Sequence, residues 1–328
     1  MKPTIFLIAA ILLLIKSNIL FSQDSIKSQL FQKRTYFKPM VSELSSTLSK
    51  VSVIAASGFK KDNKDLGKIL TEVHLGAEFP IYSRVNQKSS FSIFVPVCLH
   101  VLWATFEPKT APIVNNDYRF GFSFAYLKPL RNKYLNNVAI KLTPFAHEST
   151  HLGDEITIAG LEFDQFYRIN VSYEYYELAV TLNDPDIIKG TLFTVRAGMM
   201  GLINPQKGYY SWSDIETQGK EIFPTERWVE YYLQLQYRNT TAFYSSSRLQ
   251  FVWSFEARNR IRYDYLIDKK ELRFWSFNNY LGYDYCPNGN EGNPTFGSFF
   301  VLYRGLNFNG QLRNSRLNYI GYSMVVYI

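Results

Sequence analysis

The sequence predicts an all-β fold, a transmembrane antiparallel β-barrel of about twelve strands that follows an N-terminal signal peptide. Three observations predict it: apolar and polar residues alternate with a period of two, the first residues resemble an export signal, and aromatic residues are abundant. Phe, Tyr and Trp make up 17% of the chain, yet its mean hydropathy is slightly negative. Lipid-facing and lumen-facing residues alternate in an outer-membrane barrel and cancel in the mean, whereas a secreted β-sandwich would share only part of this composition.

The N-terminal residues have the pattern of an export signal. Lys2 precedes the apolar run Ile5–Ile15, and small or polar residues follow that run. The run has the length of a signal-peptide core and is too short to span a bilayer as a helix. No second run of this kind follows, which disfavours a helical membrane protein. We therefore expect a signal peptide at 1–22, a short periplasmic segment at 23–48 and the barrel at 49–328.

The rest of the chain divides into segments with a two-residue period, separated by turn-forming residues. In one of them Phe120, Phe122 and Phe124 alternate with Gly121 and Ser123. The lengths suit tilted membrane strands, the number is even, and the last apolar alternation runs to the end of the chain, as is common in outer-membrane barrels. The predicted strands lie near 49–57, 66–82, 89–104, 114–129, 136–151, 163–182, 190–202, 227–238, 247–260, 271–285, 295–305 and 316–328.

This strand order predicts which connections lie on which side of the membrane. With both ends in the periplasm, the turns at 83–88, 130–135 and 183–189 are periplasmic, and the longest connection, 203–226, is external. Long outer loops and short inner turns are the rule for such barrels. We therefore expect a location in the bacterial outer membrane, reached through the barrel-assembly machinery.

The net charge indicates which kinds of partner suit the chain, and the positions of the two cysteines indicate whether a disulfide is expected. The net charge of +8 suits phosphate-rich lipid or lipopolysaccharide surfaces. Arg and Lys alternate along the strands and no nucleotide-binding Gly loop is present, so nucleic acid is not favoured. Cys98 and Cys286 fall on well-separated strands, which predicts no disulfide between them.

The run from His147 to Glu155, with the sequence HESTHLGDE, carries the most chemically capable side chains. Its first letters fit the zinc-protease pattern H-E-x-x-H, which requires a helix. Pro144 could open a helix, but the alternating residues before it and Gly153 after it favour a strand, and no third zinc ligand is evident. We therefore disfavour the zinc protease.

On a strand, His147, Ser149 and His151 share one face, and the lipid face set by Val138 and Ile140 predicts that they point into the lumen. For the next strand, we predict lipid-facing Ile169, Val171, Tyr173 and Tyr175, and lumen-facing Asp164, Arg168, Asn170, Ser172 and Glu174.

The predicted pairings follow from these faces. They place Lys141 opposite Glu174 and His151 opposite Asp164. His74 is predicted to pair with His100 around the turn near residue 87, on the lumen side, with Glu72 and Cys98 nearby.

Three chemistries fit these residues. A serine hydrolase would use Ser149 as nucleophile and His147 or His151 as base. A metal site would use histidine and carboxylate ligands for a divalent ion such as Ca²⁺ or Zn²⁺, with His74 and His100 as candidates. In a purely structural lumen, arginines would pair with acids. The residues proposed to orient the catalytic histidine are Asp154, Glu155, Asp164 and Asn170, and the structural pairs would join Arg168, Arg196 and Arg258 to Glu174, Glu230 and Glu256.

Two resemblances rest on these motifs. His147 to Glu155 resembles the H-x-S-x-H-x-G-D-E signature of an uncharacterised bacterial outer-membrane barrel family, and Gly305 to Asn314 resembles that family's motif near the C-terminus. This resemblance implies the barrel fold and no particular activity.

His147 and Ser149 also resemble the His-x-Ser pair of outer-membrane phospholipase A and of lipid A deacylase barrels. That resemblance implies an acyl-ester hydrolase acting on outer-leaflet lipid or lipopolysaccharide. Those enzymes present the pair to lipid, which here would need a bulge at Pro144 to reverse the face. His151 and the Gly-Asp-Glu continuation depart from the phospholipase pattern. The alternative function is a non-enzymatic pore, or a ligand- or metal-binding barrel with a polar, histidine-rich outer lumen.

Overall fold

The structure is a computed structural model that describes most of the chain. The described residues are 27–31, 40–57, 60–61, 64–65, 69–86, 88–105, 113–130, 132, 134–151, 169–183, 193–203, 209–211, 229–239, 249–263, 271–285, 295–308 and 316–327. The expected signal peptide lies outside these ranges, as do Asp154, Glu155, Asp164, Arg168 and Cys286.

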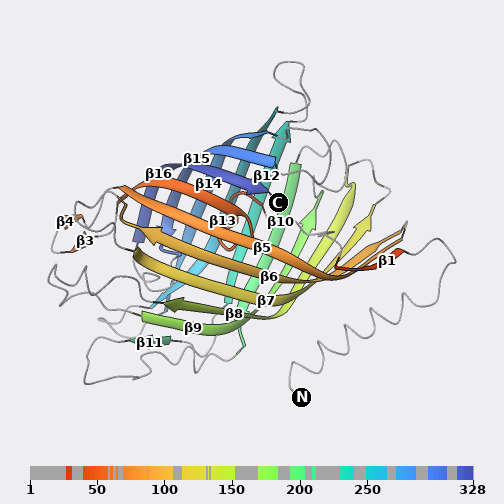
Figure 1. The fold of residues 1–328 in the computed structure, drawn as a ribbon, viewed down its shortest axis with the longest axis horizontal. Helices are drawn as coiled ribbons and strands as arrows, with labels where there is room; N and C mark the ends of the chain where they lie inside the picture. Colours follow the sequence, from red (N-terminus) through yellow and green to blue (C-terminus); the bar gives the residue numbers. More distant parts are fainter. Residues whose placement is uncertain are drawn as a thin grey trace.

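Twelve antiparallel strands form a closed barrel (Figure 1). The last strand pairs with the first, and the first pairs with the second, so the sheet closes on itself. The barrel strands are β2 (Ser49–Ser57), β5 (Ile69–Val85), β6 (Ser90–Trp103), β7 (Ile113–Pro129), β8 (Asn137–His151), β9 (Ile169–Leu182), β10 (Phe193–Leu202), β12 (Val229–Asn239), β13 (Leu249–Tyr263), β14 (Glu271–Tyr285), β15 (Thr295–Leu306) and β16 (Arg316–Tyr327).

Four short strands complete the secondary structure. β1 (Lys27–Leu30) pairs with the end of β5, and β11 (Tyr209–Ser211) pairs with the start of β9. β3 (Lys60–Lys61) and β4 (Lys64–Asp65) pair only with each other. No helix among the described residues is long and apolar enough to cross a membrane.

The two faces of the barrel wall differ as the alternation predicted. Along β7, Phe120 is 49% exposed while Ser123 and Ala125 are buried. Large exposed apolar side chains recur outside along the other barrel strands, for example Leu281 and Phe300. Such a continuous apolar surface is unfavourable in water and suits the hydrocarbon of a bilayer. The chain reverses between β5 and β6 and between β7 and β8 at one end of the barrel, where Asn86 bonds Ser89 and Leu130 bonds Asn136. β8 ends at the opposite end, which the rule of short inner turns predicts to be the outer one.

Residues 40–48, here called the plug segment, lie inside the barrel. The backbone N–H of Ser42 donates to Ser254 Oγ (3.1 Å), and the Ser42 carbonyl accepts from Asn278 Nδ2 (2.8 Å). We expected 23–48 to form a periplasmic lead; the plug segment instead finds its hydrogen-bond partners among the lumen side chains, which satisfy its backbone polar groups.

The plug segment passes very close to the barrel wall at Gly76 on β5. A Cβ atom at Gly76 would lie 2.3 Å from the carbonyl carbon of Thr47, so a larger residue would not fit. Beside this crossing, the Thr47 hydroxyl donates to Glu78 Oε1 over 3.2 Å. The wall and the plug segment are therefore fitted to each other at the level of the backbone.

Charged side chains hold the plug segment from several strands. Glu43 accepts from Arg196 Nη1 on β10 (2.9 Å) and lies 3.9 Å from Lys141 Nζ on β8. Arg119 on β7 donates to the Ser45 carbonyl (2.6 Å). Arg119, Lys141 and Arg196 are buried, and each of them meets an acid or a carbonyl oxygen.

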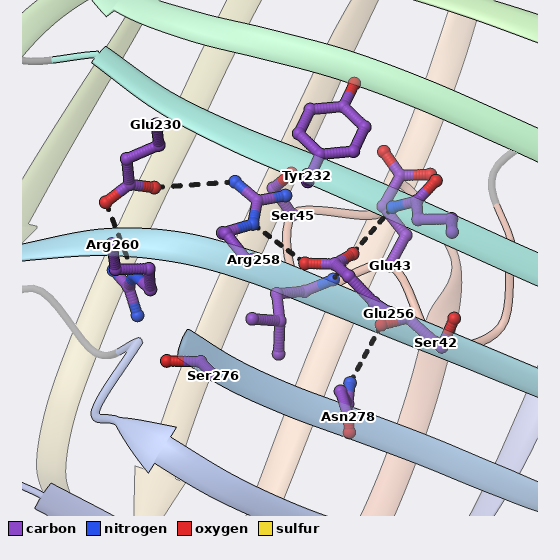
Figure 2. A network of polar contacts seen from close by, with 12 residues as sticks. Ser42, Glu43, Ser45, Glu230, Tyr232, Glu256, Arg258, Arg260, Ser276 and Asn278 are labelled. Carbon is purple, nitrogen blue, oxygen red and sulfur yellow. Dashed lines mark hydrogen bonds and ion pairs between the residues drawn. The ribbon is translucent and has the colours of Figure 1, made fainter. Parts of the chain in front are cut away.

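Figure 2 shows the arginines and acids that surround the Ser42–Ser45 stretch. Arg258 donates to Glu256 (2.7 Å) and lies 3.6 Å from Glu230, which also accepts from Arg260 (3.3 Å). The predicted pairing of Arg258 with these two acids is confirmed. Arg196 pairs instead with Glu43 in the plug segment, a partner that the strand pattern does not contain.

The contacts of the plug segment predict that replacing Glu43 lowers the stability of the barrel. Glu43→Gln would leave the Arg196 guanidinium buried without its acid, and losing one partner of a buried ion pair costs roughly 3–5 kcal/mol. We expect a lower unfolding midpoint in denaturant titrations of the detergent-solubilised barrel. Thr47→Val, which removes a neutral hydroxyl from the same segment, should cost about 1 kcal/mol.

Replacing Arg196 by Gln as well should recover part of the loss, because the unpaired charge is then gone. Equal effects of Glu43→Gln and Thr47→Val would contradict the ion-pair assignment.

Candidate functional site

The outer part of β8 is displaced by one residue relative to its inner part. Its register against β7 shifts between Phe122 and Phe124, and its register against β9 shifts between Thr143 and Ala146. The extra residue lies at Thr143–Pro144 against β7 and at Pro144–Phe145 against β9, so a β-bulge is centred on Pro144. Proline has no N–H to give to the strand ladder, so the extra residue is tolerated there.

The bulge reverses which residues face the lumen. Before it, Ala139, Lys141 and Thr143 are buried; after it, Ala146 and Thr150 are buried. The inward positions thus change from odd to even numbers.

His147 and Ser149 consequently face the lipid. They lie opposite two exposed aromatics of β7: Phe120, which is 49% exposed, and Tyr118, which is 44% exposed. The predicted lumen orientation of the pair is wrong, because it carried the lipid face of Val138 and Ile140 through the bulge unchanged.

The faces of β9 are also the reverse of those predicted. Tyr173 and Tyr175 point inward and are 2% and 0% exposed, whereas Glu174 points outward. Leu178 and Val180 further along the strand are exposed and set the phase of its lipid face. The tyrosines suit the lumen because their rings carry polar hydroxyls; the Arg119 guanidinium lies 5.6 Å from the centre of the Tyr175 ring.

His147 and Glu174 therefore both point outward and lie side by side. The residues are directly opposed in the β8–β9 register, with His147 Nδ1 3.5 Å from Glu174 Oε1. The His147 ring lies 5.3 Å from the Phe120 ring, and Ser149 lies opposite Ser172. A serine, a histidine and an acid therefore occupy neighbouring outward positions near the outer end of the barrel.

This arrangement has the ingredients of a nucleophilic site. A carboxylate at Nδ1 orients an imidazole and leaves its Nε2 available to take a proton. Ser149, two residues further along β8, lies on the same face as His147. Glu174 was not among the residues predicted to orient the histidine. The sequence signal for it is Pro144, because a bulge there turns His147 to the face that carries Glu174.

Of the other predicted pairings around the motif, that of Lys141 with Glu174 is not formed, and that of His151 with Asp164 stays a prediction because Asp164 lies outside the described residues. Lys141 lies opposite Ala179, and its Nζ lies 3.0 Å from Glu177 Oε2, so the predicted opposition of Lys141 and Glu174 is wrong. The bulge shifts the register that the prediction assumed to be continuous. The His151 backbone pairs with Asn116, while its side chain lies outside the described residues.

The remaining candidate residues are described only in part or not at all. The backbone of Asn170 pairs with Tyr210 of β11, and its side chain is outside the described residues. Asp154, Glu155 and Asp164 lie in the 152–168 stretch that the structure does not describe. Their orienting role therefore stays a prediction.

A second cluster lies on the lumen side. His74 and His100 are directly opposed and buried, as predicted. His74 Nε2 lies 2.6 Å from Cys98 Sγ, and His100 Nε2 lies 2.8 Å from Glu72 Oε1. Cys98 is a free, buried thiol. Within the described ranges, no group of three or more His, Cys, Asp or Glu side chains could hold a metal ion. The metal role of the two histidines stays a prediction.

The orientation of β8 predicts an alternating accessibility from the bilayer. With Cys286 replaced by Ser and the slow background of buried Cys98 subtracted, Ser149→Cys should react readily with a maleimide dissolved in the lipid of proteoliposomes. Glu148→Cys and Thr150→Cys point inward and should react slowly. The reverse order would restore the lumen orientation that the bulge argues against.

No protein-family model and no curated protein matches the chain. Among solved structures it is similar to outer membrane phospholipase A from Escherichia coli, with a TM-score of 0.50 and 9% identity over 86% of this chain and 93% of that one. It is also similar to a Salmonella typhi outer membrane phospholipase dimer with bound calcium (TM-score 0.46, 10% identity, 85% and 90% covered). The CymD monoaromatic hydrocarbon channel gives a TM-score of 0.38 at 11% identity, covering 85% and 87%. The closed barrel, its apolar outer face and its likeness in fold to outer membrane phospholipase A identify the chain as a twelve-stranded β-barrel of the bacterial outer membrane.

Proposed function

We propose that the protein is an acyl-ester hydrolase that acts on lipid or lipopolysaccharide of the outer leaflet. In this proposal Ser149 is the nucleophile, His147 the general base and Glu174 the residue that orients the histidine. The observation that carries it is the outward orientation of His147 and Ser149 after the bulge at Pro144, with the Glu174 carboxylate 3.5 Å from the imidazole. An ester held in the bilayer can approach Ser149 from that side.

The proposed reaction proceeds in two stages. Ser149 Oγ attacks the ester carbonyl while His147 takes the hydroxyl proton, and the tetrahedral intermediate collapses to an acyl-serine as His147 returns the proton to the leaving alcohol. Water then attacks the acyl-serine with His147 again acting as base, which releases the fatty acid and restores Ser149. Glu174 and the face of Phe120 both favour the transient imidazolium.

The surroundings of the site suit an acyl chain. From His147 toward the membrane centre, the outer face of β7 carries Phe122 and Phe124, whose rings lie 5.0 Å apart. The neighbouring strands add exposed Ile140 and Leu178. A lipid whose ester lies at the height of Ser149 would extend its chain over this apolar surface, which favours a bilayer lipid over a water-soluble ester.

The plug segment argues against the pore alternative. Its contacts with Gln236, Ser254 and Glu256 place the backbone of residues 41–44 within the lumen. Among the described residues, the lumen side chains Arg119, Arg196 and Glu256 bind this segment, which favours a filled lumen over an open aqueous path. A barrel whose chemistry faces outward does not require an open lumen.

The hydrolase proposal predicts loss of turnover in three variants. Ser149→Ala should lower the rate on phospholipid vesicles by roughly a thousand-fold or more, and His147→Ala similarly, because each removes a group that the reaction uses directly. Glu174→Gln should cost roughly ten- to a thousand-fold, since the amide no longer stabilises the imidazolium. A fluorophosphonate should label the wild-type chain and not Ser149→Ala.

Ser298→Ala is the matched control, because Ser298 is a hydroxyl on the same outer face of the barrel, on β15, where it bonds Tyr322. Assays with phospholipid and with lipopolysaccharide, each with and without Ca²⁺, cover the substrate and ion alternatives. Full activity in Ser149→Ala, or a wild-type chain that hydrolyses nothing and conducts ions in planar bilayers, would overturn the proposal.

A further inference from the structure

The strand that carries Ser149 is tied from behind by a buried hydrogen bond. Thr150 follows Ser149 and points into the lumen, where its hydroxyl donates to Asp117 Oδ1 over 2.6 Å. The two residues are directly opposed in the β7–β8 register. The bond therefore fixes both the height and the face of β8 at the position next to the nucleophile.

Asp117 is itself held by the lumen cluster. Its Oδ2 lies 3.6 Å from His100 Nδ1, and the other nitrogen of His100 lies 2.8 Å from Glu72. Thr150, Asp117, His100 and Glu72 belong to four successive strands, β8, β7, β6 and β5, and all four are buried. The Asp117 carboxylate thus lies between His100 on β6 and Thr150 on β8.

Glu148, on the other side of Ser149, also points inward. It is directly opposed to Arg119, whose guanidinium donates to the Ser45 carbonyl of the plug segment (2.6 Å). The two residues that flank Ser149 therefore both lie on the lumen side, opposite charged residues of β7. The lumen side of β8 is anchored where its lipid side carries the reactive groups.

These contacts matter because the bulge has already changed which residues of β8 face the lipid. Beyond a bulge, a slip of one residue would exchange the two faces and turn His147 and Ser149 into the lumen. Such a slip would also break the Thr150–Asp117 bond and leave a buried carboxylate without that donor, which is costly.

We propose that Asp117 and Thr150 are positioning residues for the Ser149 site, through which the buried His100 cluster holds the nucleophile at its working height on the lipid face. This inference rests on the proposed hydrolase function for its kinetic consequences. Neither residue touches the substrate, because both point to the opposite side of the barrel wall.

The chain provides a matched control for the test. Thr194 on β10 is also buried on the lumen side, and its hydroxyl donates to the Asn183 carbonyl over 2.7 Å. Asn183 follows the end of β9 that pairs with the start of β8, so this bond lies at the other end of the barrel from the proposed site. Thr150→Val and Thr194→Val thus each remove one hydrogen bond of a buried threonine hydroxyl.

We expect Thr150→Val to lower kcat on phospholipid vesicles by roughly ten- to a hundred-fold with little change in KM, because small misplacements of a nucleophile have effects of that size. Thr150→Ser should restore most of the rate, and Thr194→Val should leave it near that of the wild type. Heat-modifiable migration in electrophoresis checks that each variant forms a folded barrel.

A readout without turnover separates this inference from the hydrolase proposal. With Cys286 replaced by Ser, the labelling rate of Ser149→Cys by a lipid-dissolved maleimide should change several-fold on adding Thr150→Val and stay constant on adding Thr194→Val. That result supports the positioning role even if the wild-type chain proves inactive. Equal effects of the two valine variants on labelling would overturn it, whatever the hydrolase assay shows.

Discussion

A β-strand presents every second side chain to the same face, and β8 changes that face once, at Pro144. The inner half of the strand obeys the alternation of its neighbours, with lumen-facing Lys141 bound to Glu177. The outer half follows the opposite phase, so residues that would have filled a wet interior lie against lipid. The meeting of His147 with Glu174 depends on this local change in backbone geometry, as does the exposure of Ser149 to the bilayer.

The interior solves a different problem, that of enclosing many charged groups. Buried ions are tolerated only when each has a partner close by. Part of that partnership comes from the wall itself, as in Arg258 with Glu256, and part from the plug segment, as in Arg196 with Glu43. Among the described lumen residues, Asp117 of β7 extends these contacts to Thr150 in the outer half of β8.

The sequence predicted the strands well because alternation is a local property. The ranges of β2 and β14 coincide with those predicted, and the opposed histidines of β5 and β6 follow from counting around a short turn. The orientation of the proposed site was missed because a bulge changes no composition, and Pro144 is its only local mark. Glu43 was missed for another reason: it precedes the first alternating segment, and its partner is 153 residues away. Tyr173 and Tyr175 were assigned to the lipid face together with Ile169 and Val171, although their hydroxyls suit a polar interior.

The crossing of the plug segment over Gly76 has a consequence for how the molecule is made. Residues 40–48 come immediately before β2, and β2 forms the final seam with β16. Once that seam is zipped, the cylinder has no lateral opening through which a peptide with so many bonds to its walls could easily be inserted. We therefore expect the N-terminal stretch to be bound before β2 and β16 pair, so that the last strand closes the barrel around a core already in place.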